Sequence, residues 1–149
     1  MSAQRFQTVH AFLNSYSECS ADALLAYLSP EFSHQVLPTS IGMPKRDRDG
    51  FAGHAAMITS VFSSFAIEPQ DVFEDPTQNA VIVYAHMKGE IKGLGPHNNE
   101  CMMILRLSQD QTKIEGMTEF VDSMVAMEMK QKMVKMMGEK NGTDAMMKP

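Results

Sequence analysis

The sequence is poor in cysteine and contains no long apolar run. Its two cysteines, Cys19 and Cys101, lie far apart and do not follow the spacing of a metal site. We expect reduced thiols rather than a disulfide, because the sequence indicates an intracellular protein. The apolar runs span only a few residues, and Met1–Leu13 lacks a basic region followed by an apolar stretch. The sequence therefore predicts a cytoplasmic protein with no membrane span and no secretion signal.

Positive charge is also scarce, with 13 Lys and Arg against 18 Asp and Glu and a net charge of −5. This balance disfavours nucleic acid as a partner, because phosphate backbones are bound by basic surfaces. The five histidines show no HxH or HExxH spacing. The nucleotide signature GxGxxG, a Walker loop and the hydrolase motif GxSxG are missing as well. We therefore expect no metal and no cofactor.

The composition is that of one folded domain. The 149 residues include 44% hydrophobic and 21% charged side chains, which lies near the globular average. Residues 1–137 are predicted to form this domain, and residues 138–149, which are small and polar, are predicted to be a flexible tail.

The first half of the chain has the periodicity of helices. Apolar residues at helical spacing predict one helix over about residues 3–17, and Ser20 is placed to cap a second that Pro30 stops. A short extended stretch, Phe32–Leu37, and a loop to Asp49 come next. Asp47 or Asp49 can then cap a third helix, whose inward face carries Phe51, His54, Ile58, Val61 and Phe65.

The second half changes to the pattern of strands, in the runs Val72–Phe73, Ala80–Lys92, Asn99–Ser108 and Lys113–Asp122. Short turns between these runs predict an antiparallel meander. Neither face of the longer strands is plainly polar, so we expect helices on one face and a second copy of the chain on the other. Residues 124–137 predict a helix rich in methionine, a residue that suits adaptable contacts but also ordinary packing.

Several short stretches carry a family resemblance: His34–Pro38 with Ser40, Gly42 and Pro44; Arg46 and His54; Tyr84; Asn99–Glu100; and Glu119–Ser123. In this order the chain resembles the nuclear transport factor 2-like superfamily. Within it, the chain resembles SnoaL-like polyketide cyclases and, more closely, small fungal isomerases and cyclases of polyketide and meroterpenoid pathways. The resemblance covers about residues 5–125. It implies a cone-shaped α+β barrel, in which three N-terminal helices pack on a curved antiparallel sheet, with a helix at the C-terminal end.

Two positions depart from the wider group. Met117 stands where the bacterial cyclases usually have tryptophan, and His34 stands on the strand from which steroid isomerases supply a carboxylate base. The identity of the base is therefore open between His34 and a carboxylate of the last strand. Met117 is placed by the resemblance beside the substrate.

Three residues are the candidate catalytic groups. Asp122 ends the last predicted strand, where the resembling cyclases place their acid/base carboxylate, although it could instead cap the terminal helix. His34 shares a strand face with Phe32 and Val36 and is either a proton shuttle or a structural histidine. His54 lies on the apolar helix face, where a core histidine is the alternative interpretation.

Other residues are candidates for binding the substrate. Tyr84 and His86 point to the same side of one strand, and Tyr84 could donate to a developing oxyanion. Arg46 could clamp a substrate carboxylate, although its mixed-charge neighbours favour a solvated loop. Glu100 and Glu119 are either partners of the histidines or edge charges.

These residues predict a cofactor-independent isomerase of a fungal polyketide secondary metabolite. A base, an acid and hydrogen-bond donors in an apolar cavity would move a proton next to a carbonyl. The sharpest version, taken from the resemblance, is a tetrahydroxanthone isomerase acting on a dearomatised xanthone precursor. A polyketide cyclase and a scytalone-type dehydratase are alternatives, and a non-catalytic module that binds a ligand or a partner is another.

Overall fold

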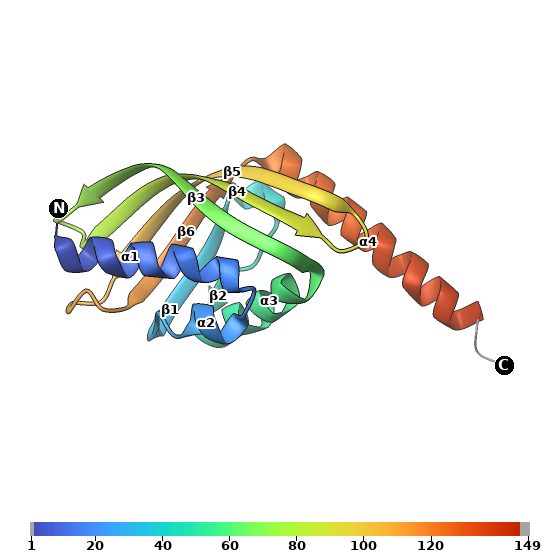
Figure 1. Ribbon diagram of the computed structural model, residues 1–149, viewed down its shortest axis with the longest axis horizontal. Coiled ribbons are helices and arrows are strands. Elements are labelled where there is room, and N and C mark those ends of the chain that lie inside the picture. The colour runs from blue at the N-terminus through green and yellow to red at the C-terminus, as the bar shows by residue number, and fades with distance from the viewer. Residues whose placement is uncertain (1, 147–149) are drawn as a thin grey trace.

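The computed structural model describes residues 2–146, with side chains described through residue 138. A curved six-stranded sheet and four α-helices make up this part of the chain, and most of the helices lie on one side of the sheet (Figure 1). In chain order the elements are α1 (Ala3–Ser15), the 3₁₀ turn η1 (Tyr16–Glu18), α2 (Ala21–Leu25), β1 (Leu28–Leu37), the 3₁₀ turn η2 (Thr39–Ile41), β2 (Arg46–Asp47), α3 (Arg48–Val61), β3 (Phe62–Asp75), β4 (Ala80–Ile91), β5 (Gly95–Leu107), β6 (Ile114–Val121) and α4 (Ser123–Met146).

The predicted helix starts are confirmed at the level of single side chains. Ser20 caps α2 by accepting from the backbone N–H of Ala23, and Asp47 caps α3 by accepting from Gly50 N–H. Each cap satisfies a backbone donor that the first turn of a helix leaves without a partner. The expected stop at Pro30 is wrong, because α2 already ends at Leu25 and Pro30 lies within β1.

The boundary between α3 and β3 differs from the expected one. The helix ends at Val61, and Phe65, which was expected on its inward face, belongs to β3. The strand begins at Phe62 and contains Pro69, where the sequence predicted a strand only after this proline. Pro69 is tolerated because β3 is the last strand of the sheet and its pairing with β4 shifts register between Pro69 and Asp71.

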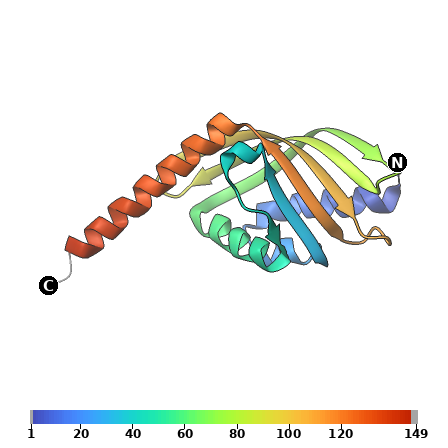
Figure 2. The ribbon, with the colours of Figure 1, turned by 180° about the vertical axis from the view of Figure 1, so that it is seen from behind.

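The sheet has the order β2-β1-β6-β5-β4-β3. Strands β3 to β6 pair antiparallel in sequence, so the predicted meander is confirmed. Strand β1 pairs parallel with β6, with His34 opposite Met117, which differs from the expected all-antiparallel sheet. In the view from behind, β1, β6 and β5 lie in front of α1 (Figure 2). This pairing brings the first strand of the chain beside the last one.

The two faces of the sheet differ in what covers them. Val81, Val83, Met103 and Leu105 alternate along β4 and β5 on the inner face, and all four are completely buried. Residues of the opposite parity point to the outer face, where Phe73, Met102 and Phe120 are exposed. The structure thus confirms an α+β fold with a curved sheet whose inner face forms the core.

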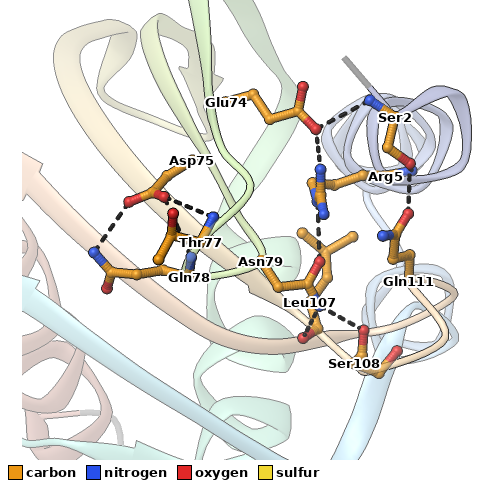
Figure 3. Close-up of polar contacts among 10 residues, drawn as sticks. All are labelled: Ser2, Arg5, Glu74, Asp75, Thr77, Gln78, Asn79, Leu107, Ser108 and Gln111. Carbon is orange, nitrogen blue, oxygen red and sulfur yellow. Dashed lines mark hydrogen bonds and ion pairs between the residues drawn. The ribbon is translucent and has the colours of Figure 1, made fainter.

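One end of the sheet is closed by a polar network (Figure 3). The buried side chain of Arg5 donates from Nε to Asn79 Oδ1, at 2.9 Å, and forms an ion pair with Glu74. Asn79 in turn donates to the carbonyls of Leu107 and Ser108. The network joins α1 to the β3–β4 and β5–β6 turns.

Helix α4 leaves the sheet after β6 and extends beyond the rest of the molecule (Figure 1). It continues to Met146, so the domain boundary expected at residue 137 falls inside a helix. The flexibility expected of residues 138–149 stays a prediction, and residues 147–149 lie outside the described part of the chain. Among the described helices, none combines the length and hydropathy needed to cross a bilayer.

Candidate functional site

A cavity of about 410 Å³ opens at the end of the sheet opposite the Arg5 network. It lies between α3, the start of β3, the inner face of the sheet and α4, and most of its lining is apolar. Its polar lining residues are few, namely Tyr16, His54, His97, Asn99, Glu119 and Lys130. A concave, mainly apolar site with a small number of polar groups is typical of a small-molecule binding site.

Glu119 and His34 form the central pair of this site. Both point to the inner face from adjacent strands, and Nε2 of His34 lies 2.8 Å from Oε2 of Glu119. The His34 side chain is fully buried, whereas the Glu119 side chain keeps 13% exposure and lines the cavity. The carboxylate is therefore the member of the pair that a bound molecule can reach.

Arg46 contacts the second ring nitrogen of His34. Its Nη1 lies 3.4 Å from Nδ1 of His34. A guanidinium can only donate, so Nδ1 accepts and the ring proton sits on Nε2, from which it is donated to Glu119. Both nitrogens of His34 thus have partners, which places the imidazole to orient the carboxylate.

His54 reaches the cavity from α3 and stacks on His34, with ring centroids 5.9 Å apart. Burial lowers the pKa of His54 to about 4, with smaller contributions from the positive charge of Arg46 and from His34. Glu119 acts in the opposite direction but does not offset them. At neutral pH His54 is therefore an uncharged imidazole, which can both donate and accept a hydrogen bond.

Tyr16 carries a hydroxyl into the same cavity from the end of the N-terminal helical segment. Its hydroxyl lies 3.9 Å from Sδ of Met117, a weak acceptor, and among the described residues it has no other acceptor. Burial first, then the charges of Glu119 and Cys101, raise the pKa of Tyr16 well above its usual value. The phenol stays protonated and is available as a hydrogen-bond donor.

Cys101 lies in the core beneath this group. Burial, followed by the charge of Glu119, raises the pKa of its thiol to about 12, so it is not ionised at neutral pH. In the part of the chain whose side chains are described, no three His, Cys, Asp or Glu residues converge in a way that could hold a metal ion.

Asp122 does not line the cavity. Its side chain is exposed, and Oδ1 accepts from the backbone N–H of Met124 at 3.0 Å and of Val125 at 3.4 Å. These are the contacts of a helix cap, the alternative interpretation of this residue. Asn99 holds the backbone nearby, since its Oδ1 accepts from Asp122 N–H.

Tyr84, His86 and Glu100 are brought together, but on the outer face of the sheet. The Tyr84 hydroxyl donates to Glu100 Oε2 at 2.6 Å and lies 3.0 Å from His86 Nε2. Their neighbours in the strands, Val83, Ala85 and Cys101, are the ones that enter the core. None of the three lines the cavity, so the structure does not place them where a substrate in the cavity would contact them.

Five of the predicted site residues therefore meet at one place, namely His34, His54, Arg46, Glu119 and Met117. The other four, Asp122, Tyr84, His86 and Glu100, lie elsewhere. Tyr16 and the methionines of α4 also line the cavity but were not among the predicted site residues. Tyr16 lies in the stretch of about residues 3–17, for which apolar residues at helical spacing predict a helix. The available signal was its hydroxyl, since a tyrosine at the end of a buried stripe needs a polar partner.

Comparison with known proteins gives a consistent set of relatives, although no family model matches the chain. Core atranone cluster (CAC) protein 11 of Stachybotrys chlorohalonatus is 33% identical over 132 residues, which are 88% of this chain and 97% of that protein. A protein named monooxygenase from Claviceps purpurea is 25% identical, over 93% of this chain and 87% of its own length. The crystal structure of the BvnE pinacolase from Penicillium brevicompactum superimposes with a TM-score of 0.83 at 18% identity, covering 89% of this chain and 95% of that one.

Proposed function

The chain belongs to the same family as Core atranone cluster (CAC) protein 11, and we propose that it is a SnoaL-like, cofactor-independent isomerase of a fungal polyketide secondary metabolite. The observation that carries the proposal is the Glu119 carboxylate, which lines the cavity and is held at 2.8 Å by a fully buried histidine. Uncharged His54 and the Tyr16 hydroxyl lie in the same cavity. The arrangement supplies a base, a proton carrier and an oxyanion donor.

The reaction that fits these groups is proton transfer next to a carbonyl. Glu119 takes a proton from the carbon beside the carbonyl, and the electron pair of the broken C–H bond moves onto oxygen as an enolate. Tyr16 donates a hydrogen bond to that oxygen. The proton on Glu119 is then delivered to another carbon, directly or through His54, so the product has the same formula as the substrate.

His34 and Arg46 are positioning residues in this scheme. The His34 Nε2 proton fixes one oxygen of Glu119, and Arg46 fixes the ring of His34. Packing and hydrogen bonds hold the base in one conformation before the reaction. Proton transfer therefore carries no further cost in side-chain rotamer entropy. We assign Asp122 the capping role and place the base at Glu119, three residues earlier on the same terminal segment of the sheet.

The cavity and the resemblance to fungal polyketide enzymes support the proposed substrate class. A volume of about 410 Å³ lies within the range of about 300–1,000 Å³ typical of small-molecule sites. Phe51, Phe62 and Phe65 contribute aromatic walls, which suit a ring system. A dearomatised xanthone or tetrahydroxanthone is the sharpest form of the proposal.

Product mass separates this proposal from dehydration and from oxygenation. Isomerisation leaves the mass of the substrate unchanged, a scytalone-type dehydration removes one water, and the oxygenation named for the Claviceps relative adds one oxygen atom. We expect turnover of unchanged mass that survives exhaustive dialysis and excess chelator. A change of mass, or activity that returns only with an added metal or nucleotide, would contradict the proposal. Binding without any turnover would favour the non-catalytic module.

We also propose a homodimer formed through the outer face of the sheet. Register places Phe73, Ile82 and Ile104 in one row and Tyr84, Met102 and Phe120 in the next, which makes an apolar patch on that face. Phe73 and Phe120 each keep more than half of their surface exposed, and patches of this kind mark interaction sites.

Sedimentation at micromolar concentration is expected to give about twice the chain mass of 16.6 kDa. Phe120→Lys places a charge in the patch without touching the cavity and is expected to give monomers. A wild-type protein that sediments as a monomer would contradict the proposed dimer.

A further inference from the structure

The cavity has an end that the proposed chemistry does not use. It is bounded by α4, whose residues Ala126, Met129, Lys130, Met133, Val134 and Met137 all line it. Their spacing of three and four residues puts them on one side of the helix. We call this side the methionine wall.

The methionine wall extends away from the polar residues Glu119, His54 and Tyr16. Glu119 lies on β6 just before α4 begins, and the wall extends over 12 residues, or 11 helical steps, from Ala126 to Met137. At a rise of about 1.5 Å per residue this is a length of about 16 Å. Met136 lies beside Gly93 in the β4–β5 turn, so α4 spans the open side of the cavity from the end of β6 to that turn. The views in Figures 1 and 2 agree with this course.

Apart from Lys130, the side chains of the wall are apolar, and their partners are too few to bury them. Met129 and Met133 are only half-buried, and Val134 and Met137 are exposed. Across the cavity, Met57, Ile58 and Met87 present further apolar surface. Methionine has three rotatable bonds and adapts to irregular shapes. Such a wall would be stabilised by an apolar group that fills the space beside it.

From this geometry we infer that the substrate is amphiphilic and enters with a fixed polarity. Its oxygenated, reacting end lies at Glu119, His54 and Tyr16, and a hydrocarbon end lies along the methionine wall, which selects its length. This inference deepens the proposed function and rests on it for the position of the reacting end.

A homologous series of neutral ligands tests the inference by binding alone. The probes are 2,4-pentanedione derivatives whose linear alkyl chain grows by one methylene at a time, titrated calorimetrically into the full chain. Affinity is expected to rise about threefold to fourfold per methylene, because each buried methylene contributes about 0.8 kcal/mol. The rise should stop once the alkyl group of the probe extends past Met133.

Met133→Gln keeps the length of the side chain but makes the wall polar. We expect the gain per methylene to fall below about twofold for the longer probes, while the shortest diketone binds as in the wild type. Met133→Leu is expected to keep the gain. Met124→Gln, on the solvent side of the same helix where Met124 is 75% exposed, is the matched control and is expected to behave as the wild type. Met129→Gln provides a second test should Met133→Gln lower the thermal midpoint.

A flat affinity across the series, no binding of any probe, or an equal gain in Met133→Gln and Met124→Gln would overturn the inference. Failure of the proposed function looks different. The methylene gain would remain in the wild-type protein, but no isomerisation would be found with any substrate.

Discussion

Replacing Glu119 with glutamine is expected to lower kcat by about 100-fold or more, since positioned acid–base groups contribute about 10²–10⁴ to the rate. Glutamine keeps the length of the side chain, and its carbonyl oxygen can still accept the proton of His34 Nε2, which lies 2.8 Å from the native carboxylate. Only the ability to take a proton is lost. KM and the thermal midpoint should therefore change little, and steady-state kinetics together with thermal unfolding monitored by circular dichroism measure all three.

Asp122→Asn is the matched control for this variant, because it makes the same chemical change three residues further along the chain. Asparagine caps a helix about as well as aspartate, so the contacts with Met124 N–H and Val125 N–H should persist. Rate and stability are both expected to stay near those of the wild type. A fully active Glu119→Gln protein beside an inactive, stably folded Asp122→Asn protein would place the base at the end of the strand and not in the cavity.

The local features of this fold could be predicted because single residues carry them. Ser20 and Asp47 cap the helices that were expected to start there, and the β-rich runs after Ala80 are strands within a few residues. The start of β3 was missed because Pro69 was interpreted as a boundary, and only the position of β3 at the sheet edge makes that proline acceptable. The parallel pairing of β1 with β6 joins segments distant in sequence, and no local pattern contains it.

The sequence predicted the types of residue in the site, but not which carboxylate lies in the cavity. A histidine of the first strand and a carboxylate of the last were both candidates for the base, and the structure places His34 and Glu119 in contact. Deciding between Glu119 and Asp122 requires knowing where β6 ends, because one residue then faces inward and the other caps α4. Strand ends are the least determined part of a sequence pattern.

Tyr84, His86 and Glu100 could not be placed for a related reason. Alternation distinguishes the faces of a strand only when one face is polar. Here Ile82, Met102 and Ile104 are on the outer face with Tyr84, so both faces of β4 and β5 look apolar in the sequence. The same apolar outer face that concealed the orientation of these strands is the surface proposed for the dimer.

Tyr16→Phe tests the oxyanion donor with the smallest possible change. Tyr16 is half-buried, and its hydroxyl contacts Met117 Sδ at 3.9 Å. Because sulfur is a weak acceptor, removing the hydroxyl forfeits little native hydrogen bonding, and the free energy of unfolding should stay within about 1 kcal/mol of the wild-type value. If the hydroxyl stabilises a developing enolate, kcat should fall by about 10²–10³, as expected for the loss of one such donor.

The control for Tyr16→Phe is Tyr27→Phe, which removes a hydroxyl from a tyrosine that packs on the same Phe12 ring but does not line the cavity. This variant should keep the wild-type kcat, so a loss confined to Tyr16→Phe would reflect the position of the hydroxyl and not the packing of the ring. A Tyr16→Phe protein with the wild-type rate would mean that the oxyanion is stabilised elsewhere. Uncharged His54, which lines the same cavity, would then be the donor to test.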